Sequence, residues 1–323
     1  MSGNIPIARI SQHCGLREAP PHRPAVPSHR PFDTVLVWYF VLTWGAGYLA
    51  VKAALPYAPP FTLLALRFTV GALLMLPVLL ITRPAMPASP GALLHVIAAG
   101  VMVHALNLGG SHYAQYLGMS AGISALTLSL QPLLTAMISV RWMHERLTRL
   151  QWLGVVLGFA GVTLIVWHKI NVRELSAGAL FAVSFALVCI TVGTLYQRRF
   201  CAGVDLRSGA VIQLGVSAAI MIPLAFAIEG APVTPSWPLF WSLAYLVVLN
   251  SILATNVLHT LMRHGEATRV TSLLYLTPIV AVALEAGMFH VVPNAITVAG
   301  ILVTCAGVGL AAWRRRDPPA TEI

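Results

Sequence analysis

One glutamate interrupts a strongly apolar run late in the chain. Glu285 lies within LTPIVAVALEAGMFHVV at 276–292, a segment with the composition of a lipid-facing helix. A charge inside a bilayer is costly, so an ionisable residue there marks either a functional site or a charge paired within the protein. Pro278 lies seven residues earlier, close to two helical turns, and therefore shares a face with Glu285. Glu285 is a candidate for proton coupling or substrate contact, with structural pairing to a neighbouring helix as the alternative.

A polar stripe lies on the apolar segment 91–111. His104, Asn107 and Ser111 are spaced i, i+3 and i+7, so they share one face of a helix. This spacing predicts that the stripe lines a cavity, where the imidazole of His104 could bind substrate or exchange protons near neutral pH. Hydrogen bonding between helices is the alternative, because polar residues in membranes also serve that purpose.

Two aromatic residues and a lysine share a face of the segment 33–54. Trp44, Tyr48 and Lys52 are spaced i, i+4 and i+8. Together they could present an aromatic wall and a cation to an anionic or zwitterionic substrate. Alternatively, Lys52 extends to the lipid headgroups and the aromatic rings lie at the membrane interface.

Two prolines are expected to break their helices and to expose polar atoms beside them. Gln131 directly precedes Pro132, and Tyr275 lies three residues before Pro278. A proline removes one backbone donor, which opens carbonyl groups toward a cavity. Gln131 and Tyr275 are therefore substrate-binding candidates, with local helix–helix hydrogen bonds as the alternative role. Asn256, which shares a face of the predicted span 238–260 with His259, is a further candidate.

The composition indicates whether these residues lie in water or in a lipid bilayer. Hydrophobic residues make up 58% of the 323 positions, charged residues only 9%, and the mean hydropathy is +0.80. Soluble domains carry roughly 25% charged residues, so the sequence predicts a polytopic membrane protein. The net charge of +10 comes from arginines spread between apolar segments, which argues against a nucleic-acid partner. The four cysteines lack metal-ligand spacing, and we expect neither a metal site nor a cofactor.

Apolar segments near 20 residues follow one another with short breaks, which predicts an all-α membrane protein. Because ten is an even number, ten transmembrane helices would place both termini on one side. Sixteen of the twenty Lys and Arg residues fall on that side and two on the other, so the positive-inside rule predicts cytoplasmic termini. The ten predicted spans are 33–54, 61–82, 91–111, 117–140, 149–168, 176–197, 208–229, 238–260, 267–289 and 293–313.

An internal repeat divides these helices into two groups of five. Five is odd, so the second group enters the membrane from the opposite side and the repeat is inverted. The predicted organisation is a disordered cytoplasmic tail at 1–32, five-helix repeats at 33–168 and 176–313, and a cytoplasmic tail at 314–323. A shift of 146 residues aligns, without a gap, Pro132 with Pro278, Gly154 with Gly300, Gly161 with Gly307 and Trp167 with Trp313.

Four stretches of the chain carry a family resemblance: WGAGYLAVKAAL in the first span, LRF at 66–68, SAGISALTLSLQPLLTAMISVRWMHERL at 120–147 and ATRVTSLLYLTPIVAVAL at 267–284. They resemble the EamA-type branch of the drug/metabolite transporter superfamily. The resemblance covers about 33–313 and implies a ten-helix carrier of the inner membrane with two inverted EamA-like repeats. It also implies movement of small metabolites, often outward, by alternating access. Such families usually carry a glutamate after both proline-bearing helices; Glu145 fills the first position, whereas Val291 occupies the second.

These features predict a secondary transporter that exports a small polar metabolite, such as an amino acid or a related compound. Membrane lipids and protons as the coupling ion are then expected partners. Gly154 and Gly158 have GxxxG spacing, which predicts close packing within the bundle or across a homodimer. A membrane-embedded enzyme acting on a lipid-linked substrate is one alternative, although the acidic residues are too scattered to form its site. A membrane subunit without transport activity is the other.

Overall fold

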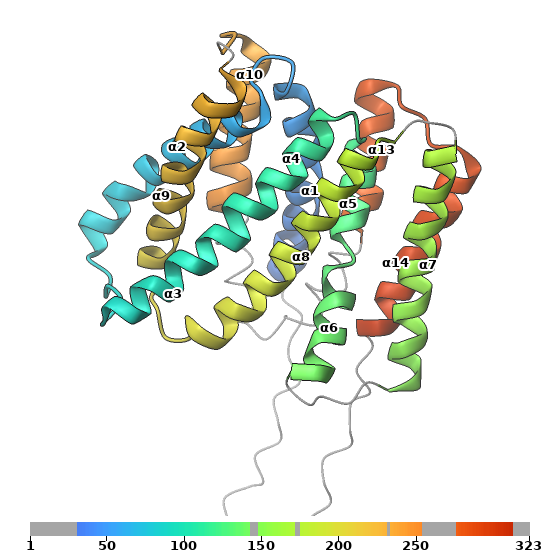
Figure 1. The fold of residues 1–323 in the computed structure, drawn as a ribbon, viewed down its shortest axis with the longest axis horizontal. Coiled ribbons are helices and arrows are strands. Elements are labelled where there is room, and N and C mark those ends of the chain that lie inside the picture. The colour runs from blue at the N-terminus through green and yellow to red at the C-terminus, as the bar shows by residue number, and fades with distance from the viewer. Residues whose placement is uncertain (1–30, 143–147, 172–174, 231–232, 254–275, 313–323) are drawn as a thin grey trace, which may run out of the picture.

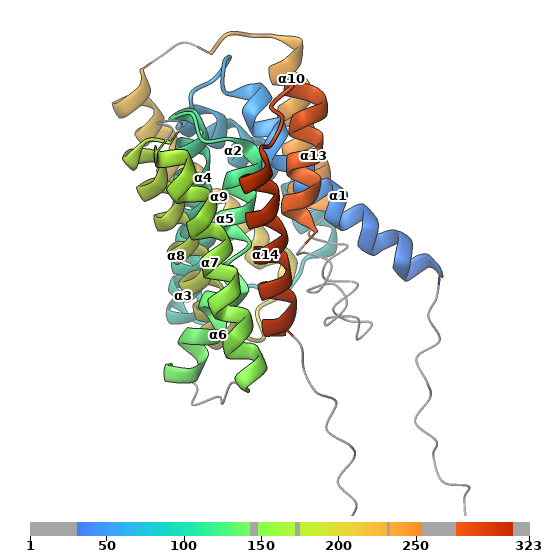
Figure 2. The same cartoon turned by 90° about the vertical axis from the view of Figure 1, so that its right-hand side faces the viewer.

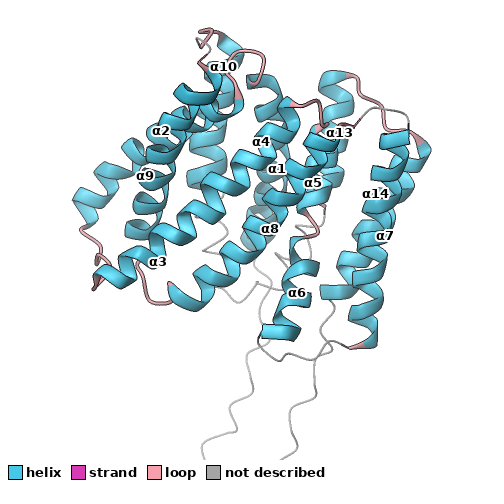
Figure 3. Cartoon of the chain, in the orientation of Figure 1, coloured by secondary structure: helices cyan, strands magenta, loops and turns pink. Residues whose placement is uncertain are grey.

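The computed structural model describes residues 31–142, 148–171, 175–230, 233–253 and 276–312, and these ranges contain helices and no strand (Figure 3). Six of these helices are long and apolar enough to cross a membrane, and three shorter apolar helices accompany them. The prediction of an all-helical, multi-pass membrane protein is therefore confirmed for the described part of the chain. Residues outside these ranges include Asn256 and Tyr275, two of the predicted substrate contacts.

The helices follow the predicted spans in order along the chain (Figure 1). The first group comprises α1 (Pro31–Ala54), α2 (Pro60–Thr82), α3 (Pro90–Gly100), η1 (Val101–Leu106), α4 (Asn107–Tyr116), α5 (Ala121–Leu128), α6 (Gln131–Trp142) and α7 (Arg149–Asn171). The second group comprises α8 (Ala177–Phe200), α9 (Leu206–Leu224), η2 (Ala225–Glu229), α10 (Trp237–Ala244), η3 (Tyr245–Leu253), α13 (Thr277–Phe289) and α14 (Ala295–Ala312).

Several helices begin at a residue whose side chain caps the first turn. Serine hydroxyls accept hydrogen bonds from the backbone three residues later, at Ser89, Ser120, Ser176 and Ser236. Asp205 accepts from the backbone of Arg207 at the start of α9. Such caps satisfy backbone N–H groups that the helix itself leaves unpaired, which fixes where each helix starts.

Three stretches of π-helix, labelled η1, η2 and η3, continue α3, α9 and α10 without a break. A π-turn closes hydrogen bonds over five residues, so residues before it face a different direction from those after it. The predicted span 91–111 is longer in the structure, because α3, η1 and α4 run continuously from Pro90 to Tyr116.

The helix of the fourth span is interrupted directly before Pro132. α5 ends at Leu128, Ser129 and Leu130 form a turn, and α6 begins at Gln131. In the second group, α13 begins at Thr277 and Pro278 lies in its first turn, where a proline fits without loss of a helical hydrogen bond.

Helices of the two groups pack against each other throughout the bundle. α14 lies beside α7, α9 beside α2, α8 beside α4, and α13 beside α1. Figures 1 and 2 show the α7 and α14 pair side by side at one flank of the bundle. Figure 2 also shows that the N-terminal part of α1 leans away from the other helices. Because the groups interleave, the boundary between them passes through the centre of the molecule.

Candidate functional site

A cavity of about 170 Å³ lies at the boundary between the two groups. Four helices of the first group, α1, α2, α4 and α5 with the adjoining start of α6, form most of its wall. α8, η3 and α13 of the second group complete it. The lining residues are Trp44, Gly47, Tyr48, Val51, Arg67, Asn107, Leu108, Ser111, His112, Gln115, Ala125, Leu128, Ser129, Gln131, Pro132, Ile190, Leu246, Asn250 and Thr277.

Most of the substrate-binding candidates that the structure describes line this cavity. Trp44 and Tyr48 reach it from α1, Asn107 from α4, and Gln131 from the start of α6. Gln131 also donates a hydrogen bond from Nε2 to Thr194 Oγ1 at 3.3 Å, so it contacts α8 as well. Residues from distant spans therefore meet at one site, with aromatic rings and amide groups on its walls.

His104 lies apart from the other members of the polar stripe. Its Nε2 and Gln213 Oε1 of α9 form a hydrogen bond of 3.2 Å, and its ring meets Phe68 edge-on at 6.2 Å. Asn107 and Ser111 line the cavity, whereas His104 does not. His104 lies within the π-turn η1 and Asn107 directly after it, so the ideal α-helical spacing that predicted one shared face does not hold here.

Arg67 supplies the positive charge of the cavity. The side chain is buried, with 6% of the residue exposed. Its Nε donates to Ser251 Oγ at 3.2 Å, and its Nη2 donates to Ser251 Oγ and Asn250 Oδ1 at 3.0 Å each. Asn250 in turn donates to the carbonyl of Thr43, and Ser251 donates to the carbonyl of Leu246. Neutral groups on η3 thus fix the guanidinium in place.

Several buried polar atoms around the cavity have no hydrogen-bond partner among the described residues. They include both ring nitrogens of His112, both amide atoms of Gln115, Oδ1 of Asn107 and Oγ1 of Thr277. Buried polar groups in proteins are nearly always paired, so unpaired groups that line one cavity are typical of a binding site. The sequence-based prediction misses His112 and Gln115 because the predicted span 91–111 ends at Ser111. α4 continues to Tyr116, and both residues extend the stripe.

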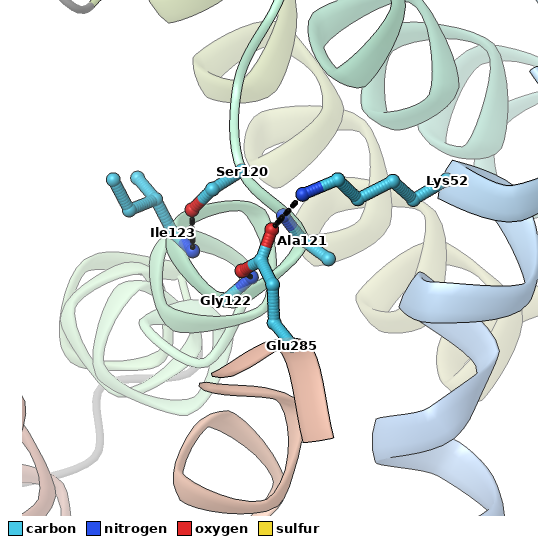
Figure 4. A network of polar contacts seen from close by, with 6 residues as sticks. All are labelled: Lys52, Ser120, Ala121, Gly122, Ile123 and Glu285. Atoms are coloured by element: carbon cyan, nitrogen blue, oxygen red, sulfur yellow. Dashed lines mark hydrogen bonds and ion pairs between the residues drawn. The ribbon is translucent and has the colours of Figure 1, made fainter. Parts of the chain in front are cut away.

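Glu285 lies beside the cavity in a dense network of contacts (Figure 4). Its Oε1 is 2.6 Å from Nζ of Lys52, and the residue is 2% exposed. The same carboxylate accepts hydrogen bonds from the backbone N–H groups of Ala121 at 3.0 Å and Gly122 at 2.9 Å. Glu285 therefore joins α13 to α1 and to the N-terminus of α5, where the helix dipole favours a negative charge.

Two neighbours shape this network. A Cβ atom on Gly122 would lie 3.2 Å from Glu285 Oε2 and 2.3 Å from Cγ2 of Val282, so only glycine allows the carboxylate this approach. Lys52 also lies over the ring of Phe289, 4.6 Å from its centroid. The Lys52 ammonium thus contacts Glu285 and Phe289 and does not line the cavity, and its contact with substrate or headgroups stays a prediction. Among the described lining residues, the cation is Arg67.

Comparison with known proteins accounts for almost the whole chain. A model of the EamA-like transporter family matches residues 34–167 and again residues 176–313. The chain belongs to this family. One relative of this EamA-like transporter is the uncharacterized inner membrane transporter YedA of Escherichia coli K12, 26% identical over 257 residues, which are 80% of this chain and 82% of YedA. Another is the uncharacterized transporter YvbV of Bacillus subtilis 168, 25% identical over 90% of this chain and 94% of YvbV.

A solved crystal structure shares the fold of this EamA-like transporter. The TM-score is 0.61 at 21% sequence identity, over 87% of this chain and 97% of the other. Family and apolar helices together identify the protein as a multi-pass membrane transporter, and its relatives are transporters rather than enzymes. The predicted resemblance and the predicted class of protein are both confirmed.

Proposed function

We propose that this EamA-like transporter is a secondary carrier that exports a small polar metabolite, such as an amino acid or a related compound, by alternating access. The central cavity is the observation that carries this proposal. Helices of both groups line it, and its walls contain buried polar atoms that have no hydrogen-bond partner in the described part of the chain. Such a site can bind a polar solute and face either side of the membrane in turn as the groups move relative to each other.

The proposal includes ten membrane-spanning helices in two inverted five-helix repeats, 33–168 and 176–313, in the inner membrane. Both termini then lie in the cytoplasm. Two matches of the family model along the chain and the unequal distribution of Lys and Arg support this arrangement. Fusions of alkaline phosphatase to the C-terminus and to each predicted loop test it, because phosphatase is active only outside the cytoplasm. Activity of the C-terminal fusion would contradict the arrangement.

A comparison of extracellular metabolites tests the direction of transport. Cells that overexpress the protein and cells that lack its gene are grown side by side, and their media are analysed by mass spectrometry. We expect at least one small polar metabolite to accumulate outside the overexpressing cells and to be depleted outside the deletion strain. Equal metabolite concentrations in the two media would contradict export. A metabolite that is depleted from the medium of the overexpressing cells would indicate uptake instead.

Glu285 is the proposed coupling residue, with His104 as the second candidate. The Glu285 carboxylate links α13 to α1 and α5, which are walls of the cavity. Lys52 is the charged group that faces it from α1, Tyr48 packs nearby on the same helix, and α5 contributes backbone N–H groups. Protonation would remove the negative charge that these groups stabilise, which would release α13 from α1 and α5.

The substitution Glu285→Gln tests this coupling role. Counterflow of the exported metabolite is measured in liposomes over a range of pH. We expect the variant to lose the pH dependence of the native protein, because glutamine keeps the shape of the side chain and cannot bind a proton. Unchanged pH dependence would exclude Glu285 and leave His104→Gln as the next test.

Glu229→Gln is the matched control for that experiment. Glu229 also accepts hydrogen bonds from two backbone N–H groups at a helix start, those of Phe61 and Thr62 on α2. It has no lysine partner among the described residues and does not line the cavity. We expect the Glu229 variant to keep the native pH dependence.

A further inference from the structure

The positive charge in the cavity has no acidic partner in the part of the chain that the structure describes. Arg67 makes hydrogen bonds only to Asn250 and Ser251, both neutral, through Nε and Nη2. No described residue accepts a hydrogen bond from its Nη1 group. A guanidinium carries five N–H donors in a planar fork that matches a carboxylate, so donors remain for a further acceptor.

The acidic side chains that the structure describes are engaged elsewhere. Glu285 pairs with Lys52 and the start of α5, Glu229 caps α2, and Asp205 caps α9. None of the three lines the cavity. A buried charge within a membrane requires a partner or water, and the described acids are not available to pair with Arg67.

Neutral polar groups surround the same space. Both ring nitrogens of His112 and both amide atoms of Gln115 lack hydrogen-bond partners among the described residues, and these residues are 2% and 7% exposed. They lie one turn apart on α4 and line the cavity together with Arg67. Among its described lining residues, the cavity therefore offers one cation and a set of neutral donors and acceptors, framed by the rings of Trp44 and Tyr48.

We propose that Arg67 binds a carboxylate group of the transported molecule and that His112 and Gln115 bind polar groups on the rest of it. The substrate is then a small organic acid that enters the site as an anion. This inference rests on the proposed transport function, since it takes the ligand of the cavity to be the cargo. Asn250 and Ser251 act as positioning residues, because they hold the guanidinium and do not themselves carry charge.

The size and charge of the cavity limit the substrate further. A cavity of about 150 Å³ is large enough for benzene, so about 170 Å³ suits a molecule of similar or slightly larger size. An ammonium group on the ligand would meet Arg67 and no carboxylate among the described lining residues, which disfavours amines. Of the small polar metabolites proposed above, the site should therefore favour an organic acid without an amino group over an amino acid. The site should thus prefer an acid over the amide and the amine of the same skeleton.

Binding to matched compounds tests this inference on the purified full-length protein. The probes are lactate with lactamide, and benzoate with benzamide and benzylamine. Thermal unfolding is recorded with each probe, and dissociation constants are obtained by titration. We expect at least one acid to raise the unfolding temperature while its amide and amine do not. The inference is overturned if no acid stabilises the protein more than its amide.

Arginine variants connect this preference to the proposed residue. Arg67→Gln should weaken acid binding about tenfold or more, the value typical of a lost charge-assisted hydrogen bond. Arg67→Lys keeps a charge without the planar fork, so it should bind more weakly and still prefer the acid. If Arg67→Gln does not fold, the Arg67→Lys variant provides the test. Native affinity of that variant for the acid would overturn the proposed site. Arg199→Gln, at an exposed position near the end of α8, is the matched control and should bind normally.

Export by the same variants separates this inference from the transport proposal. If acid binding depends on Arg67 but the overexpressing strain and the deletion strain leave identical media, the transport proposal is refuted and the Arg67 site stands. Export by Arg67→Gln at the native rate would refute the Arg67 site alone.

Discussion

Buried polar residues of this protein fall into two kinds. Glu285 is satisfied by Lys52 and two backbone N–H groups, whereas His112 and Gln115 have no partner in the described structure. An unpaired buried polar group destabilises a protein by about 1–3 kcal/mol. Residues that only support the fold have no reason to retain that cost, so the unpaired groups are the stronger candidates for contact with substrate.

Replacement of His112 by leucine should stabilise the protein and abolish transport. The apolar side chain removes two unpaired nitrogens, so the free energy of unfolding should rise by about 1 kcal/mol in the absence of substrate. Transport should fall to background because a polar contact of the cavity is lost. Thermal unfolding in detergent and counterflow in liposomes measure the two effects.

His95→Leu provides the comparison. His95 is hydrogen bonded to Tyr196 at 2.7 Å and stacks on Phe200, away from the cavity. Its loss should reduce stability by about 1 kcal/mol and leave transport intact. A destabilised His112 variant that still transports would show that His112 has a structural role.

At the scale of helices, apolar runs in the sequence predict well where the helices lie. They predict less well which side chains share one face of a helix. A run of about 20 apolar residues can satisfy its backbone within a membrane only as a helix, so composition alone predicted helices there. The π-turn before Asn107 has no comparable sequence signal, because it depends on packing against neighbouring helices. Of the polar stripe, Asn107 and Ser111 therefore line the cavity, whereas His104 lies apart from it. The roles of these residues in transport stay predictions.

The contact between α7 and α14 depends on glycines of both helices. Gly154 and Gly158, the GxxxG pair of α7, face α14, so this glycine surface is occupied within one molecule. A Cβ atom on Gly307 of α14 would lie 2.3 Å from the backbone N of Gly158 and 2.7 Å from the backbone O of Gly154. Small residues allow such close approach of two helices in a membrane.

Gly307→Leu should therefore destabilise the protein strongly. Backbone cannot move aside as a flexible side chain can, so we expect a loss of about 3 kcal/mol, at the upper end for overpacking. Gly309→Leu is the control on the same helix, because a Cβ atom there meets nothing within 4 Å. Thermal unfolding and the yield of monodisperse protein measure both variants. If the two variants were equally stable, α7 and α14 would be able to move apart around the larger side chain at little cost in stability.

At the scale of the whole molecule, charged contacts connect the two groups at the end where α1 ends and α2 begins. Glu285 joins α13 to α1 and α5, and Glu229 joins η2 to α2. The sequence places Glu285 and Lys52 on separate spans and gives no sign of their pairing, since they are 233 positions apart. Such a pairing depends on how the helices of the two groups are arranged in space. The residues around Lys52 and around Glu285 in the sequence do not contain that information.

The opposite end of the bundle is connected by uncharged contacts. His95 of α3 bonds to Tyr196 of α8, and Ser208 of α9 donates to the carbonyl of Ala85. These contacts involve helices other than α1, α5 and α13. Alternating access requires contacts at one end to break while those at the other hold, and the Glu285 network directly joins walls of the cavity. Separation of α13 from α1 is therefore the movement that we expect to open this end.

Covalent linkage of α1 to α13 should then stop transport. Cysteines replace Lys52 and Glu285 in a background where Cys14, Cys189, Cys201 and Cys305 are substituted, and a bifunctional methanethiosulfonate reagent joins them. We expect counterflow to cease on linkage and to recover on reduction, while ligand binding to the cavity persists. Linkage of Phe61→Cys to Tyr113→Cys is the control, because these rings stack at 5.6 Å within the first group. If the protein linked between α1 and α13 transports as fast as the linked control, these two helices do not separate during the transport cycle. The movement that opens the cavity must then lie elsewhere in the bundle.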